Sequence, residues 1–296
     1  MTQKLTLKER LNAYEKLMRL DQPIGILLLL WPALWALWFA SPLYQRMEIV
    51  LIFVVGTVLM RSAGCVMNDY ADRDIDPLVK RTAKRPLAAR LISPKEALVL
   101  AGVLALLAFC FVLFLNKLTI ALSFVALFLA ATYPFTKRFF PLPQAYLGIA
   151  FGFSIPMAFA AYQNTVPLLA WVVLAANIFW AIAYDTEYAM VDRDDDMKLN
   201  LKSSALLFGV FDVAVVMLCH GIFIALMAGV GAWLKLGLLY FLGLVLALAL
   251  IACQYQLIKN RERERCFKAF MNNNWVGAAI FAGLALDYYF RIPVLK

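Results

Sequence analysis

The chain alternates along its whole length between long apolar runs and short polar connections. Runs of about 20 apolar residues are typical of helices that cross a bilayer, and no segment has the strand-like alternation of an outer-membrane barrel. We therefore expect an all-α integral membrane protein with about nine transmembrane helices. The expected spans are residues 23–40, 48–67, 95–115, 118–134, 143–161, 166–184, 205–227, 236–258 and 272–290.

The amino-acid composition supports a membrane protein. Hydrophobic residues occupy 64% of the 296 positions, against about 45–50% in soluble domains. We expect residues 1–296 to form a single transmembrane domain, with residues 1–22 as a charged, amphipathic segment before the first span. No signal peptide is expected, and the acidic Glu9 and Glu15 are unlike an organellar transit sequence.

Lysine and arginine are distributed unequally between the two sides of the predicted bundle. With the N-terminus placed inside, the inner segments hold 22 of the 28 basic residues and the outer segments hold five. The positive-inside rule therefore predicts a cytoplasmic N-terminus and an outer C-terminus. The net charge of +9 reflects this asymmetry, so no nucleic-acid partner is expected. Membrane lipid surrounds the spans, and no protein partner is evident.

Sulfur and imidazole ligands are scarce in this sequence. The five cysteines form no C-x-x-C pair, and the single histidine, His220, lies in an apolar run where a packed side chain is expected. Any bound metal must therefore take oxygen ligands, which selects hard cations such as magnesium.

Ten of the 19 acidic residues fall in two inner segments, 68–76 and 185–196. These segments extend the cytoplasmic ends of the second and sixth predicted spans. Clustered carboxylates at a membrane boundary repel one another and usually mark a functional site. A solvated polar loop is the alternative.

If the first acidic stretch continues the helix of its span, at about 100° per residue, one amide and three carboxylates share a face. These are Asn68, Asp69, Asp72 and Asp76. Arg61, two turns earlier, lies on the same face, whereas Asp74 points away.

The second stretch has the same periodicity. As a helix it places Asp185, Asp192 and Asp196 on one face, with Tyr188 about 60° to the side. The remaining acids, Glu187, Asp194 and Asp195, are expected to face solvent or basic residues. Because magnesium usually bridges a few carboxylates to substrate phosphates, the two faces together predict a phosphate-bearing ligand between them.

Several basic residues accompany the two acidic stretches and could neutralise the charge of a diphosphate. Arg81 follows the first stretch, Lys137 and Arg138 lie between the fourth and fifth spans, and Arg61 lies inside an apolar span. Arginine and lysine stabilise negative charge where it develops in a transition state. Some of these residues could serve only as topology determinants. The sequence has no Walker-type or Gly-rich dinucleotide motif, so nucleotide chemistry is not supported.

These residues make the chain resemble the intramembrane aromatic prenyltransferases. The family's first motif, N-D-x-x-D-x-x-x-D, matches Asn68, Asp69, Asp72 and Asp76, and its second, D-x-x-x-D, matches Asp192 and Asp196. Three phrases resemble the branch that acts on 4-hydroxybenzoate in ubiquinone biosynthesis. They are RLDQPIG (19–25), RPLAA (85–89) and YPFTKR through PQAYLGIAFGFSIPMAFAA (133–161).

The resemblance implies nine helices around a central cavity, magnesium dependence and an active site at the cytoplasmic side of a bacterial inner membrane. It implies that the motif residues hold Mg²⁺ with the diphosphate, and that polyprenyl diphosphate and 4-hydroxybenzoate are the substrates. The expected metal-binding residues are Asn68, Asp69, Asp72, Asp76, Asp192 and Asp196. Asp69 and Asp185 are expected to support the residues that hold magnesium and the diphosphate. The expected substrate-binding residues are Asn68, Arg61, Arg81, Lys137, Arg138, Tyr188 and Asp185.

The expected reaction joins an allylic carbon of the donor to the ring carbon ortho to the acceptor hydroxyl. Asp72, Asp192 and Arg61 are the expected catalytic residues, and Asp192 could polarise the phenol. Two alternatives stay open: a related transferase that uses a naphthoate, homogentisate or haem acceptor, and a secondary transporter, since intramembrane charges also suit transport.

Overall fold

The computed structural model describes residues 6–41, 45–79 and 81–291. The described residues form twelve α-helices and three short 3-10 helices and contain no strand, which confirms the predicted fold class. The α-helices are α1 (Leu7–Leu17), α2 (Ile24–Ala40), α3 (Met47–Ala71), α4 (Pro94–Val112), α5 (Lys117–Thr132), α6 (Pro143–Gly152), α7 (Ser154–Gln163), α8 (Leu168–Lys198), α9 (Ser204–Phe208), α10 (Asp212–Trp233), α11 (Leu238–Ile258) and α12 (Arg263–Arg291). The 3-10 helices are η1 (Asp76–Leu78), η2 (Tyr133–Arg138) and η3 (Gly209–Phe211).

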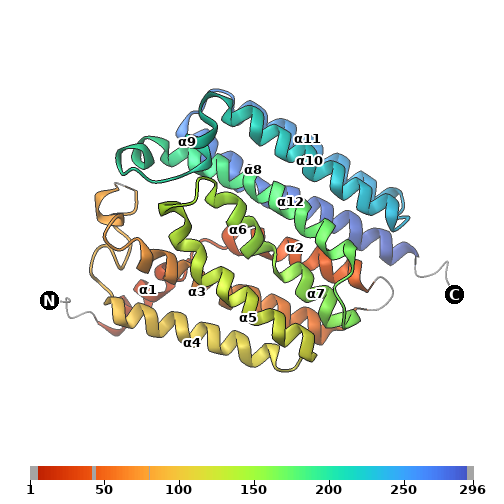
Figure 1. Cartoon of the computed structure of the whole chain (residues 1–296), viewed down its shortest axis with the longest axis horizontal. Coiled ribbons are helices and arrows are strands. Elements are labelled where there is room, and N and C mark those ends of the chain that lie inside the picture. The colour runs from red at the N-terminus through yellow and green to blue at the C-terminus, as the bar shows by residue number, and fades with distance from the viewer. Residues whose placement is uncertain (1–5, 42–44, 80, 292–296) are drawn as a thin grey trace.

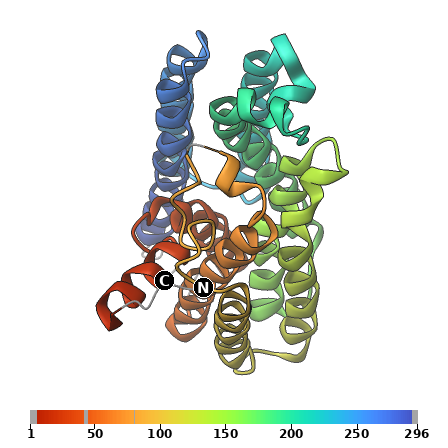
Figure 2. The same cartoon turned by 90° about the vertical axis from the view of Figure 1, so that its left-hand side faces the viewer.

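The long helices run side by side as a bundle (Figure 1). The pairs α3–α4, α8–α10 and α11–α12 pack together, and α2 packs against both α7 and α12. The short helices α1 and α9 lie at the same end of the bundle (Figure 1). Seen from that end, the connection from α3 to α4 lies among the surrounding helices (Figure 2). Both acidic stretches belong to this end.

Seven of the described helical segments are long and apolar enough to cross a membrane by length and composition, with α6 and α7 forming one of them together. α2 is apolar but has only 17 residues, and α12 has 29 residues but carries three consecutive asparagines. Each predicted span overlaps one of these helices. The total of nine spans and the cytoplasmic N-terminus stay predictions.

Side-chain caps define several of the helix starts. Thr6 and Glu9 form a capping box at α1, and Ser93 accepts a hydrogen bond from the Glu96 amide at α4. Asn116 accepts from the Thr119 amide and so begins α5 directly after α4 ends. Such caps pair backbone N–H groups that a helix leaves free at its first turn, which explains why two spans follow one another so closely here.

The two acidic stretches adopt different conformations. α8 runs without a break through Lys198, so the second stretch is helical as predicted. The first stretch is not: α3 ends at Ala71, and a turn leads into η1. Further along, Pro77 keeps an α-helix from continuing past Asp76, because a proline disfavours helical geometry in the preceding residue and cannot donate a backbone hydrogen bond. The helical phase predicted for Asp76 was therefore wrong.

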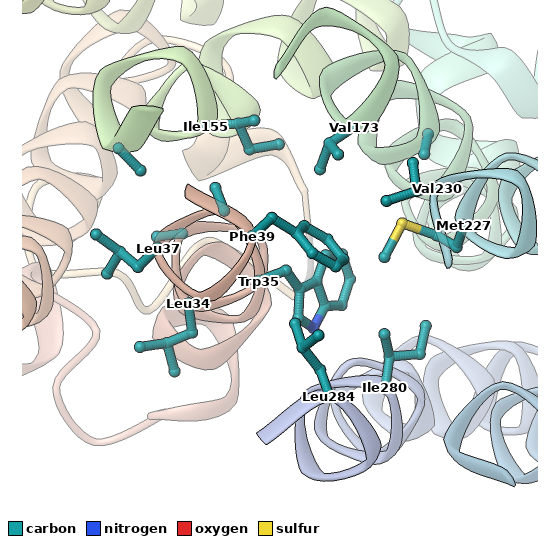
Figure 3. Packing of buried hydrophobic residues seen from close by; sticks show 14 of the residues in the cluster. Leu34, Trp35, Leu37, Phe39, Ile155, Val173, Met227, Val230, Ile280 and Leu284 are labelled. Carbon is teal, nitrogen blue, oxygen red and sulfur yellow. The ribbon is translucent and has the colours of Figure 1, made fainter. Parts of the chain in front are cut away.

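The core is centred on Trp35 of α2 (Figure 3). Its ring lies 5.2 Å from that of Trp180 in α8 and 5.9 Å from that of Phe223 in α10, and its indole N–H donates to the Gly277 carbonyl of α12 at 3.2 Å. Both ring pairs are tilted, and aromatic pairs at these separations stabilise a core beyond the area they bury. Four helices are thereby held together beside the cavity described next.

Candidate active site

A cavity of about 920 Å³ opens beside the acidic stretches. Its wall combines one face of α3 with residues of α2, α5, α6, α8 and α12, and with the segment between α1 and α2. One end is polar, where Asn68 and Asp185 line it together with arginines, and the other end is apolar, where Phe53 and Leu115 line it. The cavity therefore suits a ligand with a charged head and a long apolar tail.

Two arginines hold the first motif from the side. Arg19 donates to both carboxylate oxygens of Asp69 at 2.8 and 3.1 Å. Arg85 donates to Asp69 at 3.2 Å and to Asp76 at 3.0 Å. Asp69 is 1% exposed, so its charge is neutralised by these two cations within the protein. The sequence analysis did not identify Arg19 as a partner of Asp69. Arg19 begins the family-like phrase RLDQPIG, and Arg85 begins the family-like phrase RPLAA, so these two phrases could have pointed to both arginines.

Asp72 lies just after α3 and is buried. Lys137 of η2 donates to its Oδ2 atom, and Asn68 donates to the same oxygen at 3.4 Å. The other oxygen, Oδ1, is buried and has no hydrogen-bond partner among the described residues. Burial raises the pKa of Asp72, and Lys137 partly offsets that rise. A buried carboxylate oxygen without a partner is costly, and a hard cation would satisfy it.

The second motif meets the α3–α4 connection through Arg81. Arg81 Nε donates to Asp192 at 3.1 Å, and its other nitrogens contact Asp192 and the Tyr188 hydroxyl. Its guanidinium carbon also lies 4.7 Å from the centre of the Tyr188 ring. Burial lowers the pKa of Arg81, but Tyr188 and Asp192 more than compensate and raise it above its usual value. Arg81 therefore stays charged between the two motifs.

The residues with the D-x-x-x-D periodicity share a face of α8, but they differ in surroundings. Asp185 lines the cavity wall, while Asp196 is half-buried one turn beyond Asp192. Among the residues that the structure describes, no three His, Cys, Asp or Glu side chains gather closely enough to hold one metal ion. Magnesium is usually held by one or two carboxylates together with substrate phosphates, so it does not require such a cluster.

Arg61 points into the cavity from the middle of α3. Its guanidinium lies 5.7 Å from the centre of the Phe151 ring, and a Cβ built on Gly25 would lie 2.8 Å from its Nη2 atom. Its Nε is buried without a hydrogen-bond partner, and the described part of the chain offers it no ion pair. Gly25 makes room for this half-buried cation, which is available to an anionic ligand.

Arg138 has a different position from the other predicted basic residues. It donates to the carbonyl of Ala71, the last residue of α3, and its guanidinium lies 5.5 Å from the Phe135 ring centre. A basic side chain at a helix C-terminus complements the helix dipole and pairs a free carbonyl. Neither Arg138 nor Lys137 lines the cavity itself.

Glu187 is a correction to the predicted pattern. It does not face solvent but is fully buried among α8, α10 and α12. Asn273 donates to it at 2.8 Å, and His220 Nε2 lies 3.8 Å from its other oxygen. The expected outward position failed because α10 and α12 cover this face of α8. The other three acids outside the motif faces are at least partly exposed.

The chain matches the model of the UbiA prenyltransferase family over residues 29–277. The 4-hydroxybenzoate octaprenyltransferase of Nitrosospira multiformis is 62% identical over 287 residues, which cover 97% of this chain and 99% of that protein. The protein of the same name from Azoarcus sp. is also 62% identical, over 96% of this chain and 99% of its own length.

Solved structures share the fold. An apo UbiA homolog from Aeropyrum pernix K1 is 29% identical, with a TM-score of 0.77 over 88% of this chain and 97% of that one. A UbiA homolog from Archaeoglobus fulgidus, bound to GPP and Mg²⁺, is 19% identical, with a TM-score of 0.66 over 92% of this chain and 99% of that one. The similarity extends over nearly the whole bundle.

Proposed function

Because the chain belongs to the UbiA prenyltransferase family, we propose that it transfers a polyprenyl chain from polyprenyl diphosphate to 4-hydroxybenzoate, in ubiquinone biosynthesis. The observation that carries this proposal is that two relatives named 4-hydroxybenzoate octaprenyltransferase are 62% identical to this chain over almost its whole length. Membership in a family of transferases argues against the transporter alternative. Naphthoate, homogentisate and haem are the competing acceptors for the same chemistry.

We place the reaction at the cytoplasmic face of a bacterial inner membrane. Support comes from the end of the bundle where Lys, Arg and both acidic stretches gather, and from the positive-inside rule. A donor with a long apolar tail reaches such a site from the bilayer, while the small acceptor arrives from water.

The residues proposed to hold magnesium are Asn68, Asp72, Asp76, Asp192 and Asp196. The partnerless Oδ1 atom of Asp72 supports this assignment. Asp69 has both oxygens paired with arginines, so we assign it to positioning the end of α3. Magnesium, when bound, neutralises the diphosphate and makes it a better leaving group.

The basic residues are proposed to bind the anionic parts of both substrates. Arg81 and Lys137 already contact motif carboxylates and can turn to the departing diphosphate. Arg61, half-buried and without an ion pair among the described residues, is suited to the carboxylate of 4-hydroxybenzoate. By binding this carboxylate, Arg61 holds the acceptor ring close to the allylic carbon of the donor.

In the reaction the donor's C–O bond breaks, and its electron pair leaves with the diphosphate. The acceptor ring supplies the electrons for the new carbon–carbon bond. The carbon ortho to the hydroxyl attacks the allylic carbon, and its proton then passes to the released diphosphate, which restores the aromatic ring. In this proposal Asp192 polarises the phenol hydroxyl, with Tyr188 and Asp185 lining the acceptor position. Apolar walls such as Phe151 exclude water, which would otherwise capture the allylic cation.

A pair of variants tests the role of the first motif. Asp72→Ala should reduce prenyl transfer in membranes supplied with magnesium by at least about 100-fold, since it removes a charge that acts in the transition state. Asp74→Ala is the matched control because Asp74 belongs to the same segment, but its side chain is 83% exposed. Full activity of Asp72→Ala, with product measured by mass spectrometry, would contradict the proposed metal site.

A further inference from the structure

One face of α3 forms a continuous wall of the cavity. The lining residues recur at helical spacing from Ile52 to Asp69. At 1.5 Å per residue this wall is about 26 Å long, which approaches the roughly 30 Å of hydrocarbon in a bilayer. The cavity therefore follows α3 from the charged end of the bundle deep into its apolar part.

Gly56 lies on this wall, between the charged and apolar ends. A Cβ atom built there would have no described atom within 4 Å beyond its own helix. Gly25, by contrast, lines the same cavity but is closed off by Arg61, 2.8 Å from its Cβ position. Gly64 is also open, yet it lies one turn from Asn68 at the head of the cavity. Of these three glycines, Gly56 is therefore the one that has free space at its Cβ position and lies far from the charged end of the cavity.

The position of Gly56 can be expressed in isoprene units. It lies twelve residues before Asn68, or about 18 Å along the helix axis. An extended isoprene unit adds four chain carbons and spans about 5 Å, because each bond is roughly 1.5 Å long. A chain whose diphosphate lies beside Asn68 reaches Gly56 with about its third or fourth unit. Beyond this point the wall continues with the apolar Phe53 and Ile52.

We propose that Gly56 determines which prenyl chain lengths the enzyme accepts, by leaving the cavity open beyond about the third isoprene unit. This inference rests on the proposed transfer of a polyprenyl chain. A larger side chain at this position projects into open space, so it obstructs the tail without disturbing helix packing. The charged end, where the diphosphate and acceptor bind, stays unchanged. Gly56 is a specificity-determining position and takes no part in the chemistry.

The test is Gly56→Phe, assayed with 4-hydroxybenzoate, magnesium and either geranyl or octaprenyl diphosphate. We expect kcat/KM for octaprenyl diphosphate to fall about 100-fold, as forcing bulk into a filled site is costly. With geranyl diphosphate, whose two units end before Gly56, kcat/KM should stay within about threefold of the wild type. Gly56→Ala should still use both donors, because a single methyl group leaves the passage open.

Gly102→Phe is the matched control, since Gly102 is exposed on α4, has no described neighbour within 4 Å of its Cβ position and does not line the cavity. It should use both donors like the wild type. Octaprenyl transfer by Gly56→Phe at the wild-type rate would overturn the inference, because the tail would then avoid this wall. An equal loss with geranyl diphosphate would also overturn it.

Thermal stabilisation by the two diphosphates separates this inference from the proposed function. If the wild type transfers no prenyl group to 4-hydroxybenzoate, the acceptor assignment fails, but donor binding can still be measured. Gly56→Phe should then be stabilised by geranyl diphosphate as the wild type is, and should lose stabilisation by octaprenyl diphosphate. Equal stabilisation by both donors would refute the role of Gly56.

Discussion

Asn273 of α12 connects two buried polar groups of α8, and its replacement gives a specific stability prediction. The Trp180 indole N–H donates to Asn273 at 3.0 Å, and the Asn273 amide donates to Glu187 at 2.8 Å. All three side chains are 2% exposed or less. Asn273→Leu keeps the number and branching of the side-chain heavy atoms but leaves the indole N–H and one carboxylate oxygen without these partners.

The magnitude follows from the two lost hydrogen bonds. Hydrogen bonds between transmembrane helices average about 0.6 kcal/mol and reach about 1.7 kcal/mol. A buried polar group left unpaired costs about 1–3 kcal/mol. Among the described residues, Asn273 is the hydrogen-bond donor to the Glu187 side chain, whose other oxygen has no hydrogen bond and lies 3.8 Å from His220 Nε2. We therefore expect Asn273→Leu to lower the free energy of unfolding by about 2–3 kcal/mol.

Equilibrium unfolding in mixed micelles with rising SDS content measures this change. Asn272→Leu is the matched control, because Asn272 is adjacent on the same helix but only half-buried. It should change stability by less than about 0.5 kcal/mol. Adding Glu187→Leu to Asn273→Leu should restore part of the loss, since the unpaired carboxylate is then removed. Equal effects of the two asparagine variants would refute the reasoning.

Three further predictions follow from the packing and the site. Gly243→Ala should lower the free energy of unfolding by about 1–3 kcal/mol, because its Cβ would lie 3.0 Å from the Gly283 Cα of α12. Gly229→Ala is the control: its Cβ would have no described neighbour within 4 Å, so it should have little effect in the same unfolding assay. Arg81→Gln should lower kcat/KM for the polyprenyl donor about 10- to 100-fold through loss of a charge beside Asp192, with Arg81→Lys recovering part of it; unchanged donor kinetics would contradict this role. Chelation with EDTA should abolish transfer and excess magnesium should restore it, whereas activity that persists in EDTA would contradict metal dependence.

The helical bundle was predictable because a helix that crosses the hydrocarbon core of a bilayer needs a run of about 20 apolar residues. The resemblance to prenyltransferases, drawn from two short Asp motifs, is confirmed by the family match and the relatives. The course of α8 through Asp192 also followed from its periodicity. In the first stretch the same periodicity was misleading, because α3 ends at Ala71 and a tight turn leads into η1, which contains Pro77.

Contacts between distant segments were beyond the sequence pattern. Arg19 and Asp69 are 50 positions apart, and Glu187 and Asn273 are 86 apart. Periodicity assigns a side chain to a helix face, but only packing decides whether that face meets water, lipid or another helix. For this reason the sequence predicted which residues are chemically suited to the site but not which arginines pair with them.

The most direct test of the central claim is transfer to 4-hydroxybenzoate that carries deuterium at both ring carbons ortho to the hydroxyl. Purified protein, magnesium and octaprenyl diphosphate should give 3-octaprenyl-4-hydroxybenzoate that has lost one of the two deuterium atoms, as measured by mass spectrometry. A product that keeps both deuterium atoms would place the prenyl group elsewhere. No prenylated hydroxybenzoate, with product formed instead from a naphthoate or homogentisate in parallel reactions, would contradict the proposed acceptor.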